Sequence, residues 1–139
     1  MEKFFIIGSN SFSGSHFVDY LLGEGAEVIG ISRSPEPHPV FLPYKKRSFP
    51  DFRFYQLDLN HHLKEIMNLI KRERPDYVVN FASQSMVAES WQHPDHWYQT
   101  NVVATIKFHD ELRKCDFLKK YVHISTPEVY GNCEGLVKE

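Results

Sequence analysis

From its first residues the chain alternates between short apolar segments and amphipathic segments, and this alternation most constrains its fold. Several apolar segments have the length and the β-branched or aromatic content of buried strands. Between them, apolar residues recur at the i, i+3, i+4, i+7 spacing of an α-helix. The predicted strands are Lys3–Ile7, Glu27–Ser32, Phe52–Gln56, Tyr77–Phe81 and Tyr121–Ser125.

The amphipathic segments predict three helices. The first runs from about Phe12 to the glycines at positions 23 and 25. The second follows Asn60, which we expect to be its N-cap residue, and ends before Pro75. The third is a long helix over residues 94–114.

Residues 34–51 break this rhythm. The segment contains five prolines and the basic triplet Lys45-Lys46-Arg47. Proline disrupts a regular helix, so the segment predicts a long surface loop after the second strand. The triplet could contact a phosphate or a nucleic acid, but a solvated loop is the favoured interpretation.

Strands that alternate with helices predict an α/β fold. Right-handed crossovers place the helices on both faces of a parallel sheet, which gives a doubly wound, Rossmann-like sheet with the strand order 3-2-1-4-5. The 139 residues form one domain. Ligands of such sheets bind beyond the carboxyl ends of the strands, so the residues after each strand are the candidate site.

Composition excludes several function classes. The net charge of −2 gives no reason to expect a nucleic-acid or membrane partner, and the longest apolar run, Phe4–Ile7, is far too short to cross a bilayer. Two cysteines, Cys115 and Cys133, are too few for a disulfide framework and indicate reduced thiols in the cytoplasm.

Two histidine pairs, His61–His62 and His93–His96, invite a metal assignment. Neither pair has a carboxylate or cysteine at the spacing of a helix face, so we expect no metal site.

The turn Gly8-Ser-Asn-Ser-Phe-Ser-Gly14 links the first strand to the first helix. Glycines allow a tight turn and a close approach of the backbone to a pyrophosphate, and the helix N-terminus supplies amide donors. The turn therefore predicts a dinucleotide site, with a tight turn that binds no ligand as the alternative.

The end of the second strand indicates which dinucleotide is bound. An acidic residue there would accept the ribose 2′-hydroxyl of NAD, whereas an arginine suits the 2′-phosphate of NADP. The chain has Ser32 and Arg33 here and no acid before Glu36. NADP is therefore favoured, with NAD as the alternative.

Several motifs resemble the extended short-chain dehydrogenases/reductases, the NAD(P)-dependent epimerases and dehydratases. The first turn is similar to their G-x-x-G-x-x-G motif, with Ser11 in place of the middle glycine. Residues 75–94 resemble their fourth-strand signature, Thr100-Asn101 their helix motif, and Ile124-Ser-Thr-Pro-Glu-Val-Tyr-Gly131 their "IST[DS]EVYG" motif. The resemblance is closest to the nucleotide-sugar 4,6-dehydratases.

The resemblance implies roles for residues after each strand. It places Phe12 and Ser13 at the pyrophosphate, Asp58 and Leu59 at the adenine, and residues 81–83 beside the ribose and nicotinamide. Ser85 and Thr126 are similar to contacts to the sugar. Together with the turn and the second strand, the candidate cofactor-binding residues are Gly8, Ser11, Phe12, Ser13, Gly14, Ser32, Arg33, Asp58, Leu59, Phe81, Ala82, Ser83 and Thr100.

The same resemblance implies a reaction. After oxidation at the sugar C4, Glu128 would abstract the C5 proton as water leaves C6, and Thr126 would bind the C4 oxygen, so both are candidate catalytic residues. Pro127 departs from members with aspartate there, which leaves both proton transfers to Glu128. Epimerases need no such carboxylate, but they stay an alternative, as do related decarboxylases and a non-catalytic dinucleotide-binding module.

The catalytic tyrosine and lysine of these enzymes form a Tyr-x-x-x-Lys pair, and no tyrosine of this chain is followed by lysine at i+4. In the resembling enzymes the pair comes shortly beyond the segment matched by Gly131. The resemblance therefore implies an incomplete NAD(P)-binding domain over residues 1–139, without the later strands and the substrate-binding domain and inactive alone. It also implies a nucleotide-sugar substrate and a homodimer through the helix around Pro94–Lys114.

Overall fold

The computed structural model describes residues 1–46 and 50–138, in which five parallel strands form one sheet in the order β3-β2-β1-β4-β5. This order confirms the predicted topology. The central strand β1 pairs with β2 from Lys3↔Glu27 to Ile7↔Ile31 and with β4 from Phe4↔Tyr77 to Ile7↔Asn80. The strands are β1 (Lys3–Ile7), β2 (Glu27–Ser32), β3 (Phe52–Gln56), β4 (Tyr77–Asn80) and β5 (Lys120–His123).

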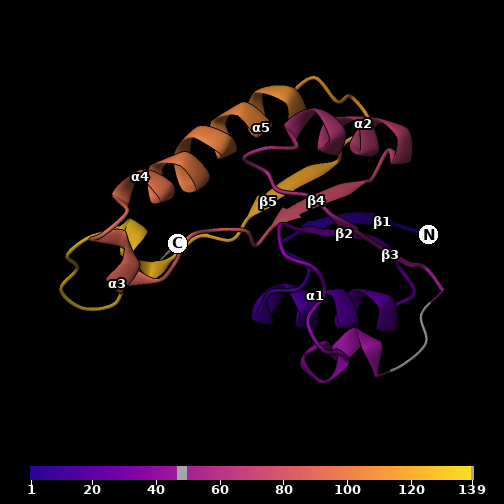
Figure 1. The fold of residues 1–139 in the computed structure, drawn as a ribbon, viewed down its shortest axis with the longest axis horizontal. Helices are drawn as coiled ribbons and strands as arrows, with labels where there is room; N and C mark the ends of the chain where they lie inside the picture. Colours follow the sequence, from indigo (N-terminus) through magenta and orange to yellow (C-terminus); the bar gives the residue numbers. More distant parts are fainter. Residues whose placement is uncertain (47–49, 139) are drawn as a thin grey trace.

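Helices cover both faces of the sheet (Figure 1). Helix α1 (Phe12–Gly23) lies on one face, and α2 (Leu63–Glu73) and α5 (Thr105–Leu112) lie on the other. Each interface contains its own buried core. The core on the α1 side includes Ile6, Val18, Leu21, Leu22, Val28 and Val79; the core on the other side includes Phe5, Ile29, Ile66, Ile70, Val78 and Phe108.

Helix α1 begins where the sequence predicts. The Oγ of Ser11, its N-cap residue, accepts a hydrogen bond from the Gly14 amide at 3.1 Å, which satisfies one of the free amides of the first turn. The apolar positions of the helix then face the sheet. Gly25, at φ +79°, reverses the chain into β2.

The prediction that Asn60 caps the second helix is wrong. Helix α2 begins at Leu63, with His62 as the residue before it. Asn60 is held elsewhere, because its amide donates to Asp58 Oδ1 at 2.8 Å and its side chain donates to Thr100 Oγ1 at 3.1 Å.

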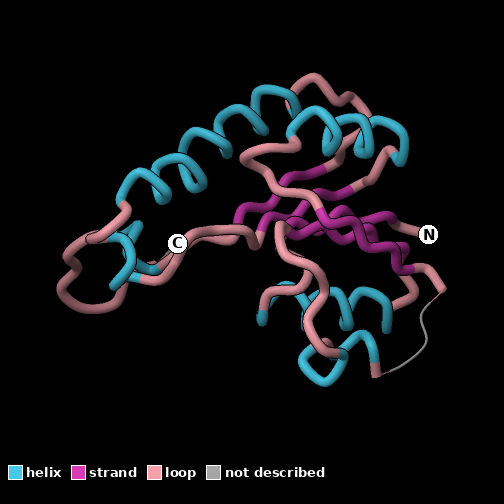
Figure 2. The backbone as a smooth tube through the Cα atoms, in the orientation of Figure 1, coloured by secondary structure: helices cyan, strands magenta, loops and turns pink. Residues whose placement is uncertain are grey.

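The predicted long helix over residues 94–114 is present but not regular. It consists of α4 (Pro94–Trp97), a π-helical segment (Tyr98–Ala104) and α5, and it follows the short helix α3 (Val87–Ser90). Figure 2 shows that α4, the π-helical segment and α5 follow one another as a continuous helical arm, residues 94–112, that extends beyond the sheet.

The predicted loop over residues 34–51 is partly ordered. Two 3₁₀ turns, Pro39–Phe41 and Pro43–Lys45, place Leu42 and Tyr44 in the core beside α1. Hydrophobic periodicity does not identify these two buried residues, because the proline-rich segment has neither a helical nor a strand period. Within the basic triplet, Lys45 forms an ion pair with Glu36 at 2.9 Å, and Arg47 lies outside the described residues.

The predicted bounds of strand β5, Tyr121–Ser125, are wrong, and its apolar pattern, typical of a core strand, lies here at an exposed edge of the sheet. The strand ends at His123, and Val122 and Ile124 are 36% and 44% exposed. It pairs only with β4 and forms one edge of the described sheet, so its apolar side chains lack the cover that both faces of a central strand receive. The fourth strand also ends one residue earlier than predicted, at Asn80.

Gly30 lies in the middle of β2, where glycine ordinarily weakens a strand. A Cβ at this position would lie 2.5 Å from the Oγ of Ser9, which is completely buried in the first turn, and 3.0 Å from the Phe52 ring. Gly30 thus provides the space in which the first turn rests on the sheet.

Within the described residues, no helix has the length and apolar character needed to cross a membrane.

Candidate cofactor and substrate site

The carboxyl ends of the strands surround a cavity. It lies at the ends of β1, β2 and β4 and the segment after β3, where a doubly wound sheet binds its ligands. All but three of the residues predicted to bind the cofactor line it. The lining residues are Ile7, Gly8, Asn10, Ser11, Ser32, Arg33, Ser34, Leu57, Asp58, Leu59, Asn60, Phe81, Ala82, Ser83, Gln84 and Thr100.

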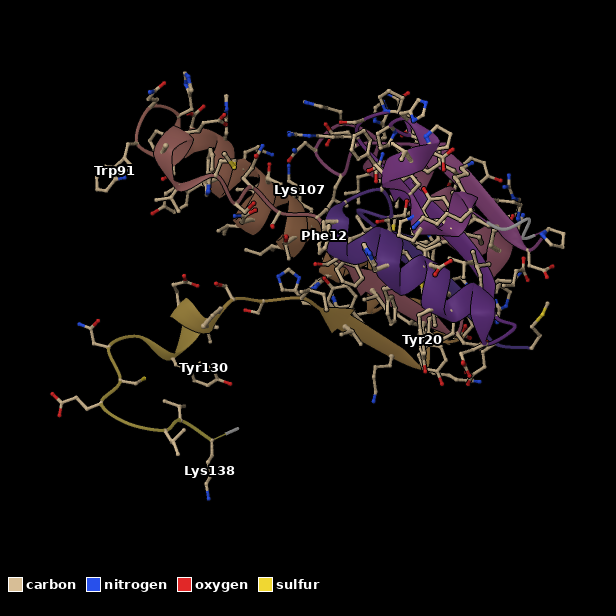
Figure 3. The ribbon with its side chains drawn as sticks, turned by 90° about the horizontal axis from the view of Figure 1, so that it is seen from below. Phe12, Tyr20, Trp91, Lys107, Tyr130 and Lys138 are labelled. Atoms are coloured by element: carbon tan, nitrogen blue, oxygen red, sulfur yellow. The ribbon has the colours of Figure 1, made fainter. Side chains whose placement is uncertain are left out.

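The first turn shows why its glycines are needed. Gly8 has φ +79°, and a Cβ on Gly14 would lie 2.2 Å from the Gly8 carbonyl oxygen. The helix therefore starts directly against the end of the strand. Three predicted residues do not line the cavity, namely Phe12, Ser13 and Gly14. Phe12 is 81% exposed, and Figure 3 shows it at the N-terminal end of α1.

Asn10 holds the first turn against the end of β2, and the sequence prediction missed it. Its side-chain amide donates to the carbonyl oxygens of Ser34 and Pro35 at 3.1 and 3.0 Å, and its backbone amide donates to Ser32 Oγ at 3.3 Å. The turn motif itself gives no signal for this contact, because the acceptors lie more than twenty residues away.

The first acid after β2, Glu36, does not line the cavity. The Glu36 carboxylate accepts from the Tyr44 hydroxyl at 2.8 Å and pairs with Lys45 at 2.9 Å. Burial and this hydrogen bond raise the pKa of Tyr44. Arg33 is therefore the charged residue that the end of β2 presents to the cavity.

The segment after β3 is joined to the helical arm by the Asn60–Thr100 hydrogen bond of 3.1 Å. The Oδ1 of Asn60 is buried and has no hydrogen-bond partner among the described residues. With the hydroxyls, amides and Arg33 of the same cavity, this free acceptor makes a lining suited to a polar ligand such as a dinucleotide.

Two asparagines fix the loop after β4. Asn80 Oδ1 accepts from the Ala82 amide at 2.8 Å. Asn101, from the π-helical segment, accepts from the Gln84 amide at 2.8 Å and donates to the Gln84 carbonyl at 3.0 Å. These bonds hold Phe81, Ala82 and Gln84 at the cavity wall.

A second cavity adjoins the first through residues 82–84. Ser85, Thr126 and Glu128, the predicted substrate-binding and catalytic residues, all line it, as do Trp97 and His123. The Thr126 hydroxyl donates to the Glu128 carboxylate, and the short 3₁₀ turn Pro127–Tyr130 presents both side chains. The predicted hydroxyl and carboxylate are therefore adjacent, beside the loop that separates the two cavities.

His123, which the sequence prediction did not single out, anchors this cavity to the sheet. Its Nδ1 lies 3.0 Å from the Tyr121 hydroxyl and 3.5 Å from Asn80 Nδ2. Nearby, burial and the charge of His123 lower the pKa of His109. The alternation of residues along the strand could have placed Tyr121 and His123 on one face.

The sequence led us to expect no carboxylate at helix-face spacing beside either histidine pair, and Asp95 lies next to His96 rather than at such a spacing. The ligand atoms of His93, Asp95 and His96 lie within 4.8 Å of one another. Asp95 lies in the short helix α4 beside His96, so a spacing of three or four residues does not reveal this group.

A family model described as GDP-mannose 4,6 dehydratase matches residues 5–139. The chain belongs to this family. The match extends over both cavities, so the turn at residues 8–14 and the Thr126–Glu128 pair are parts of one family pattern.

Curated relatives of this family member include both epimerases and dehydratases. The UDP-glucose 4-epimerase of Streptococcus mutans serotype c is 33% identical over 129 residues, which are 91% of this chain and 36% of the relative. The dTDP-glucose 4,6-dehydratase of Xanthomonas campestris pv. campestris strain B100 is 27% identical over 141 residues, 94% of this chain and 39% of the relative. The chain thus spans a little over one third of their length.

Solved structures share the fold. The UDP-glucose 4-epimerase of Stenotrophomonas maltophila with bound NAD superposes with a TM-score of 0.82 at 20% identity, over 97% of this chain and 40% of that one. The UDP-Glc/GlcNAc 4-epimerase of Campylobacter jejuni gives a TM-score of 0.81 at 25% identity, over 94% and 39% of the two chains.

Proposed function

We propose that residues 1–139 form the dinucleotide-binding part of a nucleotide-sugar 4,6-dehydratase. The observation that carries the proposal is the Thr126–Glu128 pair in a cavity next to the proposed cofactor cavity. A carboxylate there serves elimination, which requires a base for the C5 proton. Epimerisation at C4 returns the hydride to C4 and needs no such base.

A dinucleotide held in the first cavity would supply a hydride acceptor for the sugar C4 and later a hydride donor, while the C4 hydroxyl proton would pass to a base of the Tyr-x-x-x-Lys type, which these 139 residues do not contain. The chain's own residues orient the reactants. Gly8, Asn10 and Ser11 of the first turn, which line the cavity, would bind the pyrophosphate. On substrate binding, the Thr126 hydroxyl would turn from Glu128 and donate to the C4 oxygen, and Glu128 would take the C5 proton and deliver a proton to the departing C6 hydroxyl.

UDP-glucose 4-epimerase is the second candidate activity. It is supported by the 33% identity to the Streptococcus mutans epimerase, compared with 27% for the Xanthomonas dehydratase. Pro127 also differs from the acidic residue of many dehydratases, which leaves Glu128 as the carboxylate of this turn.

Isotope transfer distinguishes the two activities in the protein that carries this chain. With a nucleotide hexose deuterated at C4, a dehydratase gives a product lighter by one water with deuterium at C6, whereas an epimerase gives an unchanged mass with deuterium still at C4. Glu128→Gln should slow the dehydratase by about 10²–10⁴-fold. Glu134→Gln, an exposed glutamate later in the same segment, is the matched control. Deuterium retained at C4 would reject dehydration.

The chain of 139 residues alone should show no turnover, since a general base of the Tyr-x-x-x-Lys type does not occur in it. Turnover by the purified chain of verified mass would contradict this expectation.

For the cofactor we propose NADP. Arg33 lines the cavity at the end of β2, and Glu36 is held by Tyr44 and Lys45 rather than offered to a ribose. NAD is the alternative, supported by the NAD bound in the Stenotrophomonas epimerase. A guanidinium that hydrogen-bonds a phosphate contributes about 1.5–3 kcal/mol.

Calorimetric titration of the chain tests this assignment. Arg33→Ala should lower the affinity for NADP by about 10- to 100-fold and leave the affinity for NAD nearly unchanged. Lys64→Ala, an exposed cation on α2, should change neither affinity. Tighter binding of NAD than of NADP by the unmodified chain would reject the preference.

A further inference from the structure

Three potential metal ligands converge at the start of the helical arm, far in sequence from the first turn. His93, Asp95 and His96 each offer one ligand atom, and these atoms lie within 4.8 Å of one another. Across residues 1–46 and 50–138 this is the only such group of three or more. The proposed dinucleotide and sugar contacts use none of the three.

The backbone explains why these side chains meet. Pro94 is the first residue of α4, and the His96 amide donates to the His93 carbonyl at 3.1 Å, which closes a tight turn. The His93 amide donates to the Glu89 carbonyl at 2.9 Å and ties the turn to the preceding helix. The two imidazole rings stack, with centroids 5.0 Å apart and planes 16° apart.

We infer that this His93–Asp95–His96 triad binds a divalent transition-metal ion. Two imidazoles and a carboxylate suit zinc, nickel, copper(II) and cobalt(II), whereas magnesium and calcium prefer oxygen ligands alone. Three protein ligands leave at least one coordination position for water. The ion thereby cross-links the turn between α3 and α4.

The required adjustment is small. Metal–ligand distances of about 2.1 Å in a tetrahedral site put ligand atoms roughly 3.5 Å apart. The observed spacing of up to 4.8 Å closes to that value by side-chain rotation, and the exposed side chains are free to rotate: those of Asp95 and His96 are 79% and 59% exposed. Asp95 Oδ2 and His96 Nε2 are already 3.8 Å apart.

The other histidine pair is arranged differently. His62 Nδ1 accepts a hydrogen bond from the Asp58 amide at 3.0 Å, so this nitrogen is engaged beside the cofactor cavity. His61 is exposed and is not part of a group of three ligands in the described chain. His61 therefore provides a matched control for the triad.

Cobalt(II) is the first probe, because it gives visible absorption bands and substitutes for zinc. Trp91 and Trp97 flank the triad in sequence, and Figure 3 shows Trp91 at the tip of the helical arm, so metal occupancy should also quench tryptophan fluorescence. We expect one cobalt ion per chain, displaced by one equivalent of zinc, with calorimetry giving the same stoichiometry.

Substitutions locate the site. His93→Ala and His96→Ala should each lower the affinity for zinc by at least about tenfold, and Asp95→Asn should lower it less. His61→Ala should have no effect. Far-ultraviolet circular dichroism and the melting midpoint check that each variant is folded, which is expected because all three side chains are exposed.

Equal zinc affinity in the unmodified chain and the His93→Ala variant, or an equal loss in His61→Ala, would overturn the inference. Binding of magnesium as tight as that of zinc would overturn the assigned metal class. The affinity for NADP is measured in parallel and should not change in the triad variants, so failure of this inference and failure of the proposed function are separate results.

Discussion

At the scale of single residues, a charge cluster at the amino ends of the strands illustrates how position determines ionisation. Both oxygens of the Glu73 carboxylate accept hydrogen bonds from Arg53, at 3.0 and 2.8 Å, and Lys3 Nζ lies 3.5 Å away. The Arg53 hydrogen bonds lower the pKa of Glu73 from 4.5 to about 2. This carboxylate therefore remains ionised in acid that protonates an ordinary glutamate.

Glu73→Gln should lower the free energy of unfolding at neutral pH by an amount on the order of 1 kcal/mol, because the amide cannot replace the charged bidentate pair. The folded-state pKa lies below the ordinary value, so the stabilisation is complete above about pH 4.5 and disappears as the pH falls toward 2. The melting midpoint measured between these values should fall more steeply in the unmodified chain than in the variant.

Glu24→Gln, at an exposed glutamate after α1, should keep the steep pH dependence. Identical pH profiles for the unmodified chain and Glu73→Gln would contradict the proposed role of the Arg53 pair.

At the scale of elements, the π-helical segment is the main device that shapes the site. A wider helical turn often occurs at functional sites, and here Thr100 and Asn101 extend from it to two different loops. The segment thus connects the loop after β3 and the loop after β4 through a single helix.

Asn101→Ala should release the loop after β4, because two hydrogen bonds to Gln84 are lost. We expect a destabilisation of about 1–3 kcal/mol and faster hydrogen exchange of the Gln84 amide, which is measurable by nuclear magnetic resonance. NADP affinity should fall with it. Asn68→Ala, at an exposed position on α2, is the control, and unchanged exchange at Gln84 would refute the clamp.

Most elements could be predicted from the sequence, because the apolar residues of a strand or helix that packs on the core recur at the period of that element. The bounds of β1, β2 and β3 coincide with the predicted ones. The errors fall where distant contacts override local signals. Asn60 has the side chain of a helix cap, yet it binds Thr100, forty residues later.

The candidate site follows the same rule. Arg33, directly after β2, was predictable because topology brings the carboxyl ends of parallel strands to one edge, whereas Asp58 was predicted from the family resemblance. Asn10 and Asn101 were not predicted as site residues, although Asn101 is part of the helix motif, because each bonds to the backbone of a loop that is distant in sequence. The grouping of Asp95 with two histidines likewise depends on the short helix α4, where Asp95 lies beside His96.

At the scale of the whole molecule, the outer edge of β5 and the helical arm are the surfaces suited to self-association. Val122 and Ile124 are exposed on the edge, and Tyr98 and Ile106 are 68% and 63% exposed on the arm. An uncovered apolar edge pairs readily with another strand. The sequence-based proposal of a homodimer through the arm competes with this route.

Val122→Lys should reduce concentration-dependent association if the edge is responsible, since charged residues oppose edge pairing. Ile106→Lys should reduce it if the arm is responsible. Light scattering and sedimentation over a range of concentrations measure both, with Val129→Lys, outside the sheet, as the control. A monodisperse monomer of the unmodified chain at high concentration would exclude both routes.

The absence of a side chain at Gly30 couples the evolution of positions 9 and 30, which are far apart in the sequence. The Oγ of Ser9 occupies the volume into which a Cβ on residue 30 would project. A residue larger than glycine at position 30 is therefore tolerated only if the side chain at position 9 becomes smaller. Substitutions at these two sites should therefore be accepted in pairs during divergence, and a homologue with alanine at position 30 should carry glycine at position 9.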